Sequence, residues 1–211
     1  MRLAIIGTGN VGSALARALG RTHQIIFGVR DPLDPQAVLK ASALKADLVN
    51  MQSVASRADA IILAVPWDAA VDAVKSLGDI TGKLLIDATN PLHSGKDGLS
   101  LAVGFSESGA ERIGQAAQGA HVVKAFNQTG ADNMADLKGY AIKPVMFVAG
   151  EDAAAKKTAL QIVSDAGFRA EDAGPLRMAR LLEPLAMLWI SKAFGGRGRD
   201  WSFALIEKAK P

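Results

Sequence analysis

The sequence has no cysteine, few aromatic residues and no long apolar run. The absence of cysteine from the 211 residues excludes disulfides, cysteine-ligated metals and a cysteine nucleophile. No apolar stretch reaches the roughly 18 residues that a membrane-spanning helix needs. The apolar start at residues 3–6 is broken at once by glycines and polar residues, which argues against a secretory signal. We therefore expect a cytoplasmic protein without a membrane partner.

The excess of positive charge is small and spread along the chain. There are 24 Lys and Arg against 21 Asp and Glu, which gives a formal net charge of +3 at pH 7. A nucleic-acid surface combines a basic patch with interleaved aromatics, and neither occurs here, so no nucleic-acid partner is expected. The surplus instead favours attraction of a small anionic ligand. No set of residues has the spacing of a metal site or of a Ser-His-Asp triad, so no metal and no catalytic residue is predicted.

Short apolar segments alternate along the chain with segments of helical period. We predict strands at residues 2–7, 23–29, 59–65, 83–88, 121–126, 144–149 and 168–172. We predict helices at residues 10–20, 36–44, 51–57, 67–77, 106–117, 152–166 and 175–194, and a loop at 89–104. This alternation indicates an α/β fold, a Rossmann doubly wound parallel sheet with helices on both faces and a small C-terminal α/β cap.

The helix predicted at 175–194 carries an apolar stripe and an internal proline. We expect the stripe to consist of Met178, Leu181, Leu182, Leu185 and Trp189. Pro184 predicts a kink or break, because proline cannot complete the helical hydrogen bonds. The stripe is long for a small tail, which favours a homodimer, although it could equally pack within one chain.

The strongest motif is Gly7-Thr8-Gly9-Asn10-Val11-Gly12, which follows a predicted strand and opens a predicted helix. That context is the one in which G-x-G-x-x-G marks a dinucleotide site. Gly7 would permit the tight turn, Gly9 the approach of the pyrophosphate, and Gly12 the close packing of helix on strand. The alternative is a tight turn without a ligand. We predict that the whole segment, including Thr8, Asn10 and Val11, binds the cofactor.

The end of the second strand indicates which dinucleotide binds. NAD-binding proteins place an acid there, whereas this strand ends in Val29-Arg30. Arginine can pair with the 2′-phosphate and stack on adenine, so NADP(H) is favoured over NAD(H). Asp31 would repel the phosphate if its carboxylate faced the ribose. The alternative is that Arg30 is a solvated loop residue paired with Asp31.

Polar or turn-forming segments follow three further strands, where doubly wound sheets bind ligands. We predict cofactor contacts from Ala64, Val65, Pro66, Trp67, Thr89, Asn90 and Pro91. We predict substrate contacts from Leu92, Asn127, Gln128 and Thr129. The alternatives are a core position for Trp67 and an Asx-type turn before Pro91. Lys124 lies within a strand and is interpreted as structural, and His93 as an exposed loop residue.

These motifs resemble the NADP-dependent deazaflavin (coenzyme F420) oxidoreductases and their bacterial dinucleotide-binding relatives. The reductase domains of the STEAP ferric reductases are more distantly similar. Val29, Asp31 and Asp34 depart from the serine and basic residues of the archaeal enzymes. The resemblance covers nearly the whole chain and is carried by residues 7–12, 28–30, 65–67, 87–92, 123–127, 172–176 and 180–183.

The resemblance implies a dinucleotide domain followed by a small part that covers the redox site, often in a dimer. We assign residues 1–126 to an NADP-binding Rossmann domain and 127–211 to a part that completes the redox site, where Gly174 and Pro175 join the substrate contacts. The favoured function is hydride exchange between NADPH and a deazaflavin coenzyme. The alternatives are reduction of FMN, FAD or a ferric chelate, and a non-catalytic NADP(H)-binding redox sensor. An imine or hydroxy-acid dehydrogenase ranks last, because too little chain follows residue 126 for a helical second domain.

Overall fold

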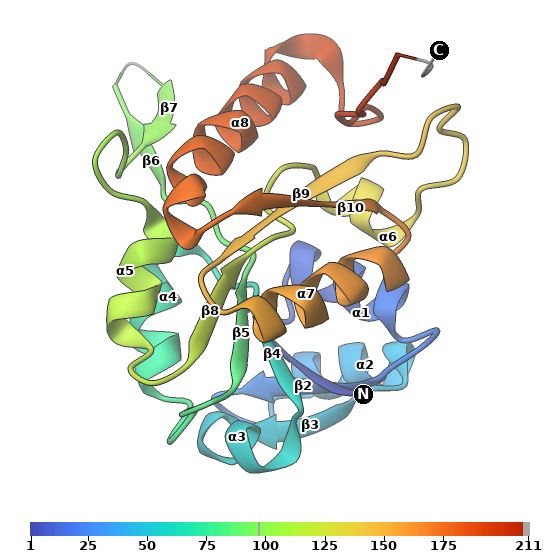
Figure 1. The fold of residues 1–211 in the computed structure, drawn as a ribbon. Coiled ribbons are helices and arrows are strands. Elements are labelled where there is room, and N and C mark those ends of the chain that lie inside the picture. Colours follow the sequence, from blue (N-terminus) through green and yellow to red (C-terminus); the bar gives the residue numbers. More distant parts are fainter. Residues whose placement is uncertain (97, 209–211) are drawn as a thin grey trace.

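The computed structural model describes residues 1–96 and 98–208 and contains one large sheet covered by helices (Figure 1). Its eight strands run in the order β10-β9-β8-β5-β4-β1-β2-β3. All neighbouring strands are parallel except β8 and β9, which are antiparallel. The predicted doubly wound α/β fold is confirmed. The strands are β1 Arg2–Ile6, β2 Gln24–Val29, β3 Asp47–Asn50, β4 Ala60–Leu63, β5 Leu84–Asp87, β8 His121–Lys124, β9 Val145–Gly150 and β10 Arg169–Gly174.

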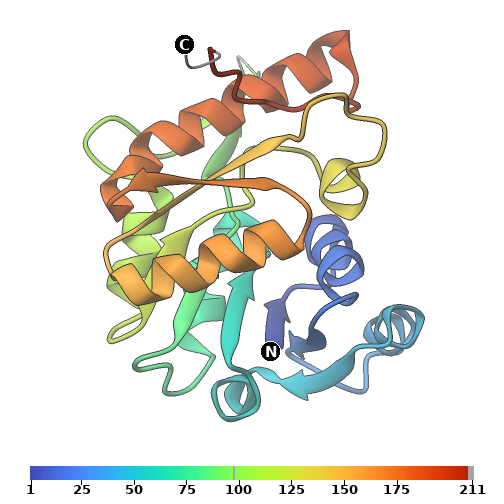
Figure 2. The ribbon, with the colours of Figure 1, turned by 45° about the vertical axis from the view of Figure 1, so that its right-hand side comes forward.

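Helices cover both faces of this sheet. The first core contains side chains of α1, α2, α6 and α7, and the second contains side chains of α3, α4 and α5. Figure 2 shows α7 and α1 in front of the strands on the first face. The helices are α1 Asn10–Leu19, α2 Pro35–Leu44, α3 Val54–Arg57, α4 Trp67–Lys75, α5 Gly109–Ala116, α6 Ala131–Ala135, α7 Ala153–Asp165 and α8 Ala179–Lys192.

Strand β1 shows why the central strands are mainly apolar. Leu3 and Ile5 belong to the first core, whereas Ala4 and Ile6 belong to the second. Because successive side chains point to opposite faces and both faces are covered, these four positions are buried, and only Arg2 at the start of the strand is exposed. Apolar runs of this kind were sufficient to predict β1, β2, β4, β5, β8 and β9.

Several elements differ from the sequence-based predictions. The predicted loop 89–104 is wrong in part, because it contains an antiparallel hairpin of β6 Leu92–Gly95 and β7 Gly98–Leu101. Its strands are mostly exposed and lack an apolar face, so no alternating pattern marks them. Strand β3 was not predicted because only one of its four positions is buried, and helix α6 because its five residues are too few to show a helical period. The predicted helix at 51–57 is a 3₁₀ turn followed by the short α3.

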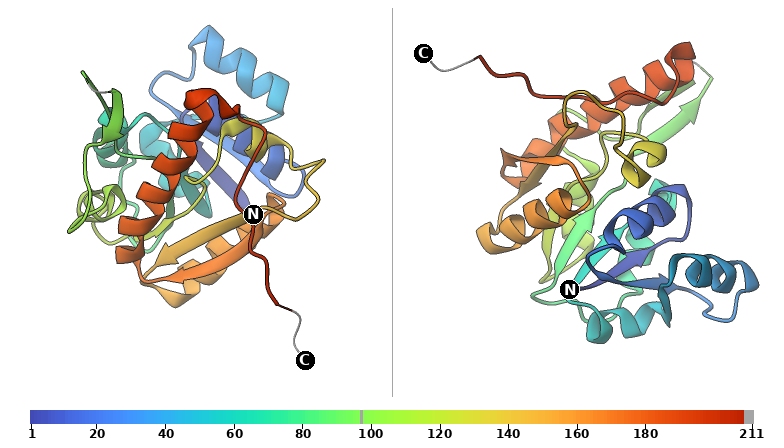
Figure 3. Two further views of the ribbon diagram at one scale, coloured as in Figure 1. Left: turned by 90° about the horizontal axis from the view of Figure 1, so that it is seen from above. Right: turned by 90° about the vertical axis from the view of Figure 1, so that its right-hand side faces the viewer.

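Helix α8 corrects two predictions for the C-terminal segment. It runs without a break from Ala179 to Lys192 through Pro184, so a break at this proline is wrong, and the alternative of a kink stays a prediction. The predicted stripe is also rotated, because Leu181 is 61% exposed and the buried face contains Glu183 in its place. Figure 3, seen from above, shows this helix crossing over the strands. The residues of α8 that are buried are Ala179, Leu182, Glu183, Ala186 and Trp189.

The C-terminal strands β9 and β10 belong to the same sheet as the strands before residue 126. Helix α7 connects them, and β9 pairs with β8 through Val123–Gly150 and Lys124–Ala149. The division of the chain at residue 126 therefore does not separate two sheets, and its functional meaning stays a prediction. None of the helices within residues 1–96 and 98–208 is long and apolar enough to cross a membrane.

Candidate functional site

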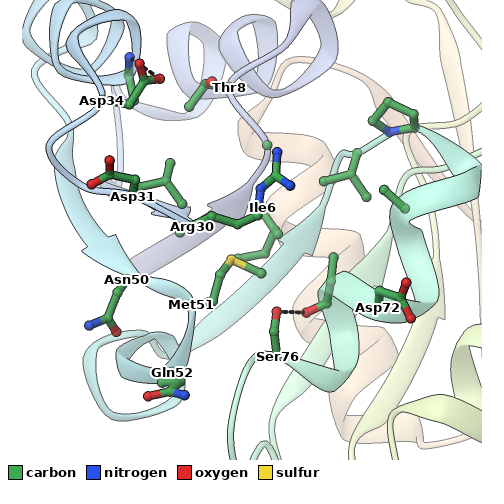
Figure 4. A pocket seen from close by; sticks show the side chains of 18 of the residues that line it. Ile6, Thr8, Arg30, Asp31, Asp34, Asn50, Met51, Gln52, Asp72 and Ser76 are labelled. Carbon is green, nitrogen blue, oxygen red and sulfur yellow. Dashed lines mark hydrogen bonds between the residues drawn. The ribbon is translucent and has the colours of Figure 1, made fainter.

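A cavity of 1420 Å³ opens where β1, β2, β3 and β4 end (Figure 4). Its wall includes Ile6 to Thr8 after β1, Gly28 to Asp31 at the end of β2, and Val65 and Pro66 after β4. Ligands of doubly wound sheets bind outside the carboxyl ends of the strands. The predicted cofactor residues Gly7, Thr8, Val29, Arg30, Val65 and Pro66 therefore meet in one cavity.

The glycine-rich loop has the geometry that a pyrophosphate site requires. Gly7 has a φ of +108°, in the region that favours glycine. A Cβ on Gly12 would lie 1.9 Å from the carbonyl oxygen of Gly7, so the loop and α1 can only pack this closely with glycine there. A Cβ on Gly9 would meet nothing within 4 Å, and Asn10 is exposed beside it. Within residues 1–96 and 98–208 no side chain caps the N-terminus of α1, so its first backbone N–H groups can bind an anion.

Two side chains fix the carbonyl of Thr8 within this loop. The Ser13 hydroxyl donates to it at 3.1 Å, and the Lys40 ammonium of α2 donates to it at 2.9 Å. Lys40 therefore brings a positive charge to the loop for which a phosphate contact is predicted. No sequence pattern marked Lys40, because it lies some thirty residues after the loop on a helix with a weakly defined apolar face.

Arg30 faces the cavity without an acidic partner. Figure 4 shows its side chain extending into the middle of the cavity, while the Asp31 carboxylate points to the other side. Asp31 accepts a hydrogen bond from the Leu33 backbone at 2.9 Å, and Asp34 caps α2. No ion pair involves Arg30 in the part of the chain that the structure describes, so the alternative of an Arg30–Asp31 pair is not observed.

The segment after β4 divides between the cavity and the core. Val65 and Pro66 line the cavity, and the Ala64 N–H donates to the Ile6 carbonyl at 2.9 Å. Trp67 instead packs against the second core, and a Cβ on Gly109 would lie 3.0 Å from its ring. The geometry thus favours the core position for Trp67, and its predicted cofactor contact stays a prediction.

Asn90 and Asn127 form a reciprocal amide pair between the ends of β5 and β8. The Asn90 side-chain amide donates to the Asn127 carbonyl at 2.9 Å. The Asn127 side-chain amide donates to Asn90 Oδ1 and to the Leu182 carbonyl, each at 3.1 Å. Asn90 is partly exposed, whereas Asn127 is only 3% exposed. Asn90 is therefore the member of the pair that can contact a ligand.

Gln128 and Thr129 are committed to contacts within the protein. Gln128 exchanges two hydrogen bonds with the Phe147 backbone and donates a third to Asn127 Oδ1. The Thr129 hydroxyl accepts from the Asn133 amide at 2.9 Å. These side chains are 2% and 6% exposed. Their predicted contact with substrate stays a prediction, and the observed bonds fix the turn after β8.

Gly174 and Pro175 lie at the end of β10, on the outer edge of the sheet. Gly174 is level with Ala149 of β9, which pairs with Lys124 of β8. Neither Gly174 nor Pro175 lines the cavity, although the next residues contact β8 and α5. Leu92 begins the hairpin directly after Pro91 and is partly buried. The role of these residues toward a substrate stays a prediction.

A cluster of three ionisable groups is buried behind the turn that contains Thr89. Lys124 lies 2.9 Å from both Asp87 and Glu183 and donates to the Thr89 carbonyl at 2.6 Å. Asp87 and Lys124 are 0% exposed and Glu183 is 1% exposed. Burial acts to lower the pKa of Lys124, but the two carboxylates outweigh it and hold that pKa above its ordinary value. The sequence-based interpretation of Lys124 as a structural residue agrees with this geometry.

The fold and the glycine-rich loop together define a dinucleotide-binding α/β protein. Residues 2–91 match the model of the family described as NADP oxidoreductase, coenzyme F420-dependent. An F420-dependent NADP reductase of Methanothermobacter marburgensis is 31% identical over 95% of this chain and 96% of its own length. The chain belongs to this family of NADP-dependent oxidoreductases, as its motifs predicted.

Two further relatives agree with this assignment. The structure of a candidate F420-dependent NADP reductase from Arthrobacter sp. FB24 superimposes with a TM-score of 0.88, at 28% identity, over 97% of this chain and 99% of that one. The metalloreductase STEAP3 of Rattus norvegicus is 27% identical over 89% of this chain, which spans 37% of that protein. The fold of the whole chain is therefore shared with the first of these two proteins.

Proposed function

We propose that this protein is an NADPH-dependent oxidoreductase that exchanges hydride with a deazaflavin coenzyme of the F420 type. The observation that carries the proposal is the cavity that joins the glycine-rich loop to Arg30, in a chain of the F420-dependent family. The end-to-end match to the reductase of M. marburgensis supports the same acceptor, because 96% of that protein's length is represented here.

The described residues fit NADP(H). The glycine loop leaves space at Gly9 and unpaired N–H groups at the start of α1, which suit a pyrophosphate. Arg30 extends into the cavity where it can pair with the 2′-phosphate of the adenosine half. The nicotinamide half would then lie toward Thr89, Asn90 and Pro91. When bound, NADPH supplies the hydride that an oxidised deazaflavin takes up together with a proton.

The acceptor half of the site would be built from the ends of β5 and β8 and from residues 127–211. The Asn90 side-chain amide could form a further hydrogen bond to the deazaflavin ring. Leu92 offers an apolar surface at the start of the hairpin. Asn127 and Gln128 would support this surface from behind, because their amides are paired with protein atoms. With few acid–base groups at hand, holding the two rings in contact would supply most of the rate.

Stopped-flow oxidation of NADPH tests the proposal directly. The protein is mixed in parallel with NADPH and with coenzyme F420, FMN, FAD or ferric citrate as acceptor. We expect rapid turnover with coenzyme F420 and slow turnover with the others. Turnover with flavin or ferric citrate alone would establish the alternative acceptor, and NADPH binding without turnover would establish a redox sensor.

We further propose a cytoplasmic homodimer that buries the exposed side of α8. Leu181 and Leu188 on this helix are 61% and 48% exposed, and Phe194 in the following turn is 71% exposed. Large apolar side chains exposed together mark association surfaces. Light scattering after size-exclusion chromatography should give twice the 22.0 kDa chain mass, and Leu188→Glu should shift it to the monomer.

A further inference from the structure

The buried cluster of Lys124, Asp87 and Glu183 connects the last helix to the turn after β5. Lys124 spends its three N–H donors on Asp87, Glu183 and the Thr89 carbonyl. Burial of ionised groups costs several kcal/mol for each ion, and an apolar cluster of similar volume is often equally stable. Stability alone therefore does not explain three buried charges here. The segments that these charges hold in place offer another reason.

One side of the cluster fixes the turn that carries Asn90. Asp87 Oδ1 accepts both the backbone N–H of Thr89 at 2.9 Å and its hydroxyl at 2.7 Å. Lys124 donates to the Thr89 carbonyl, which belongs to the next peptide unit and leads into Asn90. The next residue, Asn90, is the partly exposed amide at the end of β5. Its direction is thus set by two buried charges that do not themselves reach the surface.

The other side of the cluster fixes two helices. Glu183 of α8 accepts the N–H of Gly109 at 2.8 Å and that of Ala110 at 3.0 Å, in the first turn of α5. This junction is tightly packed, because a Cβ on Gly109 would lie 3.0 Å from Trp67, 3.1 Å from Glu183 and 3.3 Å from Pro91. Pro91 directly follows Asn90, so this side of the cluster also bounds the turn.

The backbone that faces the turn is itself strained. Phe126, fully buried at the end of β8, has a φ of +61°, which a phenylalanine rarely adopts. The strained residue leads directly into Asn127, whose amide holds Asn90 and the α8 carbonyl of Leu182. Both supports of Asn90, the charged cluster and the strained β8 turn, therefore depend on the position of α8.

We propose that Glu183 is a positioning residue for hydride transfer, which acts through Lys124 and the Thr89–Asn90 turn to hold the nicotinamide end of the site. This inference rests on the proposed function. Glu183 is 1% exposed and its carboxylate contacts Lys124 and the N–H groups of α5, so its effect on the reaction would come through the orientation of the reacting rings. The cavity proposed for the adenosine half of the cofactor lies at the other strand ends, from β1 to β4. Loss of Glu183 should therefore slow hydride transfer without weakening the binding of NADPH.

Glu183→Gln separates positioning from folding. The change leaves Lys124 and Asp87 as a neutral pair, so no unpaired charge stays buried, but it removes an acceptor for the α5 N–H groups. Glu111→Gln is the matched control. Glu111 joins the same two helices at the surface, through Arg180 at 2.6 Å and the Ser108 hydroxyl at 2.7 Å, without contacting Lys124.

The measurements are single-turnover hydride transfer from NADPH to coenzyme F420 and NADPH affinity by fluorescence titration. We expect Glu183→Gln to slow hydride transfer at least about tenfold, because small misplacements of reacting groups are costly, with the Kd for NADPH changed less than about twofold. Glu111→Gln should keep both values within about twofold of the unsubstituted protein. A proportional rise in Kd, or hydride transfer as fast as in Glu111→Gln, would overturn the inference.

Glu183→Asp keeps the test decisive if the glutamine variant does not fold. It retains the charge for Lys124, but its shorter side chain cannot also reach both N–H groups of α5. We expect a slower transfer, by at least about threefold, and an unchanged Kd for NADPH. An unchanged rate in this folded variant would overturn the inference. If the unsubstituted protein transfers no hydride to coenzyme F420, the proposed function fails instead, independently of any variant.

Discussion

A Cβ on Gly12 would lie 1.9 Å from the carbonyl oxygen of Gly7, whereas a Cβ on Gly9 would meet no atom within 4 Å. The two glycines of the same loop therefore serve different purposes. Gly12 lets α1 pack on the turn, and Gly9 leaves room outside the protein, where the pyrophosphate of a dinucleotide would approach.

Alanine at these two positions should affect different properties, stability at Gly12 and cofactor binding at Gly9. Gly12→Ala should lower the free energy of unfolding by about 1–3 kcal/mol, because the loop or α1 must move to accept the methyl group. Gly9→Ala should leave that free energy within about 0.5 kcal/mol and weaken NADPH binding by at least about tenfold. Urea unfolding and fluorescence titration check both. Equal stability losses in the two variants would contradict this reading of the loop.

Arg30 should determine the preference for the phosphorylated cofactor. Loss of a charge-assisted contact to phosphate costs about 1.5–3 kcal/mol, so Arg30→Ala should raise the Kd for NADPH by about tenfold or more. The Kd for NADH should change less than about threefold, because NADH lacks the phosphate. Arg57→Ala, an exposed arginine of α3 outside the cavity wall, is the control. If Arg30→Ala still preferred NADPH over NADH, a residue other than Arg30 would have to bind the 2′-phosphate.

Lys124 should contribute far more to stability than Lys156, a lysine whose carboxylate partner is half exposed. Lys124→Met leaves Asp87 and Glu183 as buried carboxylates without a cation, which should cost about 3–5 kcal/mol. Lys156→Met removes comparable contacts, to Asp172 at 2.9 Å and the Gly174 carbonyl at 3.1 Å. Since Asp172 is half exposed, the second loss should stay below about 1 kcal/mol. If urea unfolding gave similar losses in the free energy of unfolding for the two variants, the buried carboxylates would not depend on Lys124 for their compensating charge.

The Glu111–Arg180 pair should make stability depend on pH. The hydrogen bond from Arg180 outweighs burial and holds the pKa of Glu111 below its ordinary value of 4.5. A lowered pKa contributes stability that is present above the ordinary value and is lost as the pH falls through the folded-state value. Glu111→Gln should therefore be less stable than the unsubstituted protein by up to about 1 kcal/mol near neutral pH. The difference should vanish well below pH 4.5, and a difference independent of pH would contradict the assignment.

The parallel part of the sheet and the cofactor loop could be predicted from the sequence for a physical reason. Strands buried on both faces are apolar at most positions, and a glycine loop between strand and helix is typical of a dinucleotide site. The short β3 and the exposed hairpin β6–β7 have neither signal. The pairing of β3 with β2 depends on neighbours that are distant along the chain.

The less predictable part of the site is its support. Glu183 was hidden because a helical pattern treats an acid as solvent-facing, and only the tertiary contact with Lys124 buries it. Because Glu183 was taken as exposed, the predicted buried stripe of α8 was rotated, and Leu181 was wrongly placed on its buried face. Asn127 and Gln128 were predicted to contact substrate, which stays a prediction, and only the structure shows that their amides are paired with protein atoms.

Transfer of deuterium from NADPH that carries deuterium at both C4 positions tests the central claim most directly. The protein is incubated in ordinary water with labelled NADPH and oxidised coenzyme F420, and the reduced coenzyme is analysed by mass spectrometry. Direct hydride exchange between the two bound rings predicts one deuterium in each reduced coenzyme for each NADPH oxidised. Reduced coenzyme without deuterium, or no reduction at all, would contradict the account.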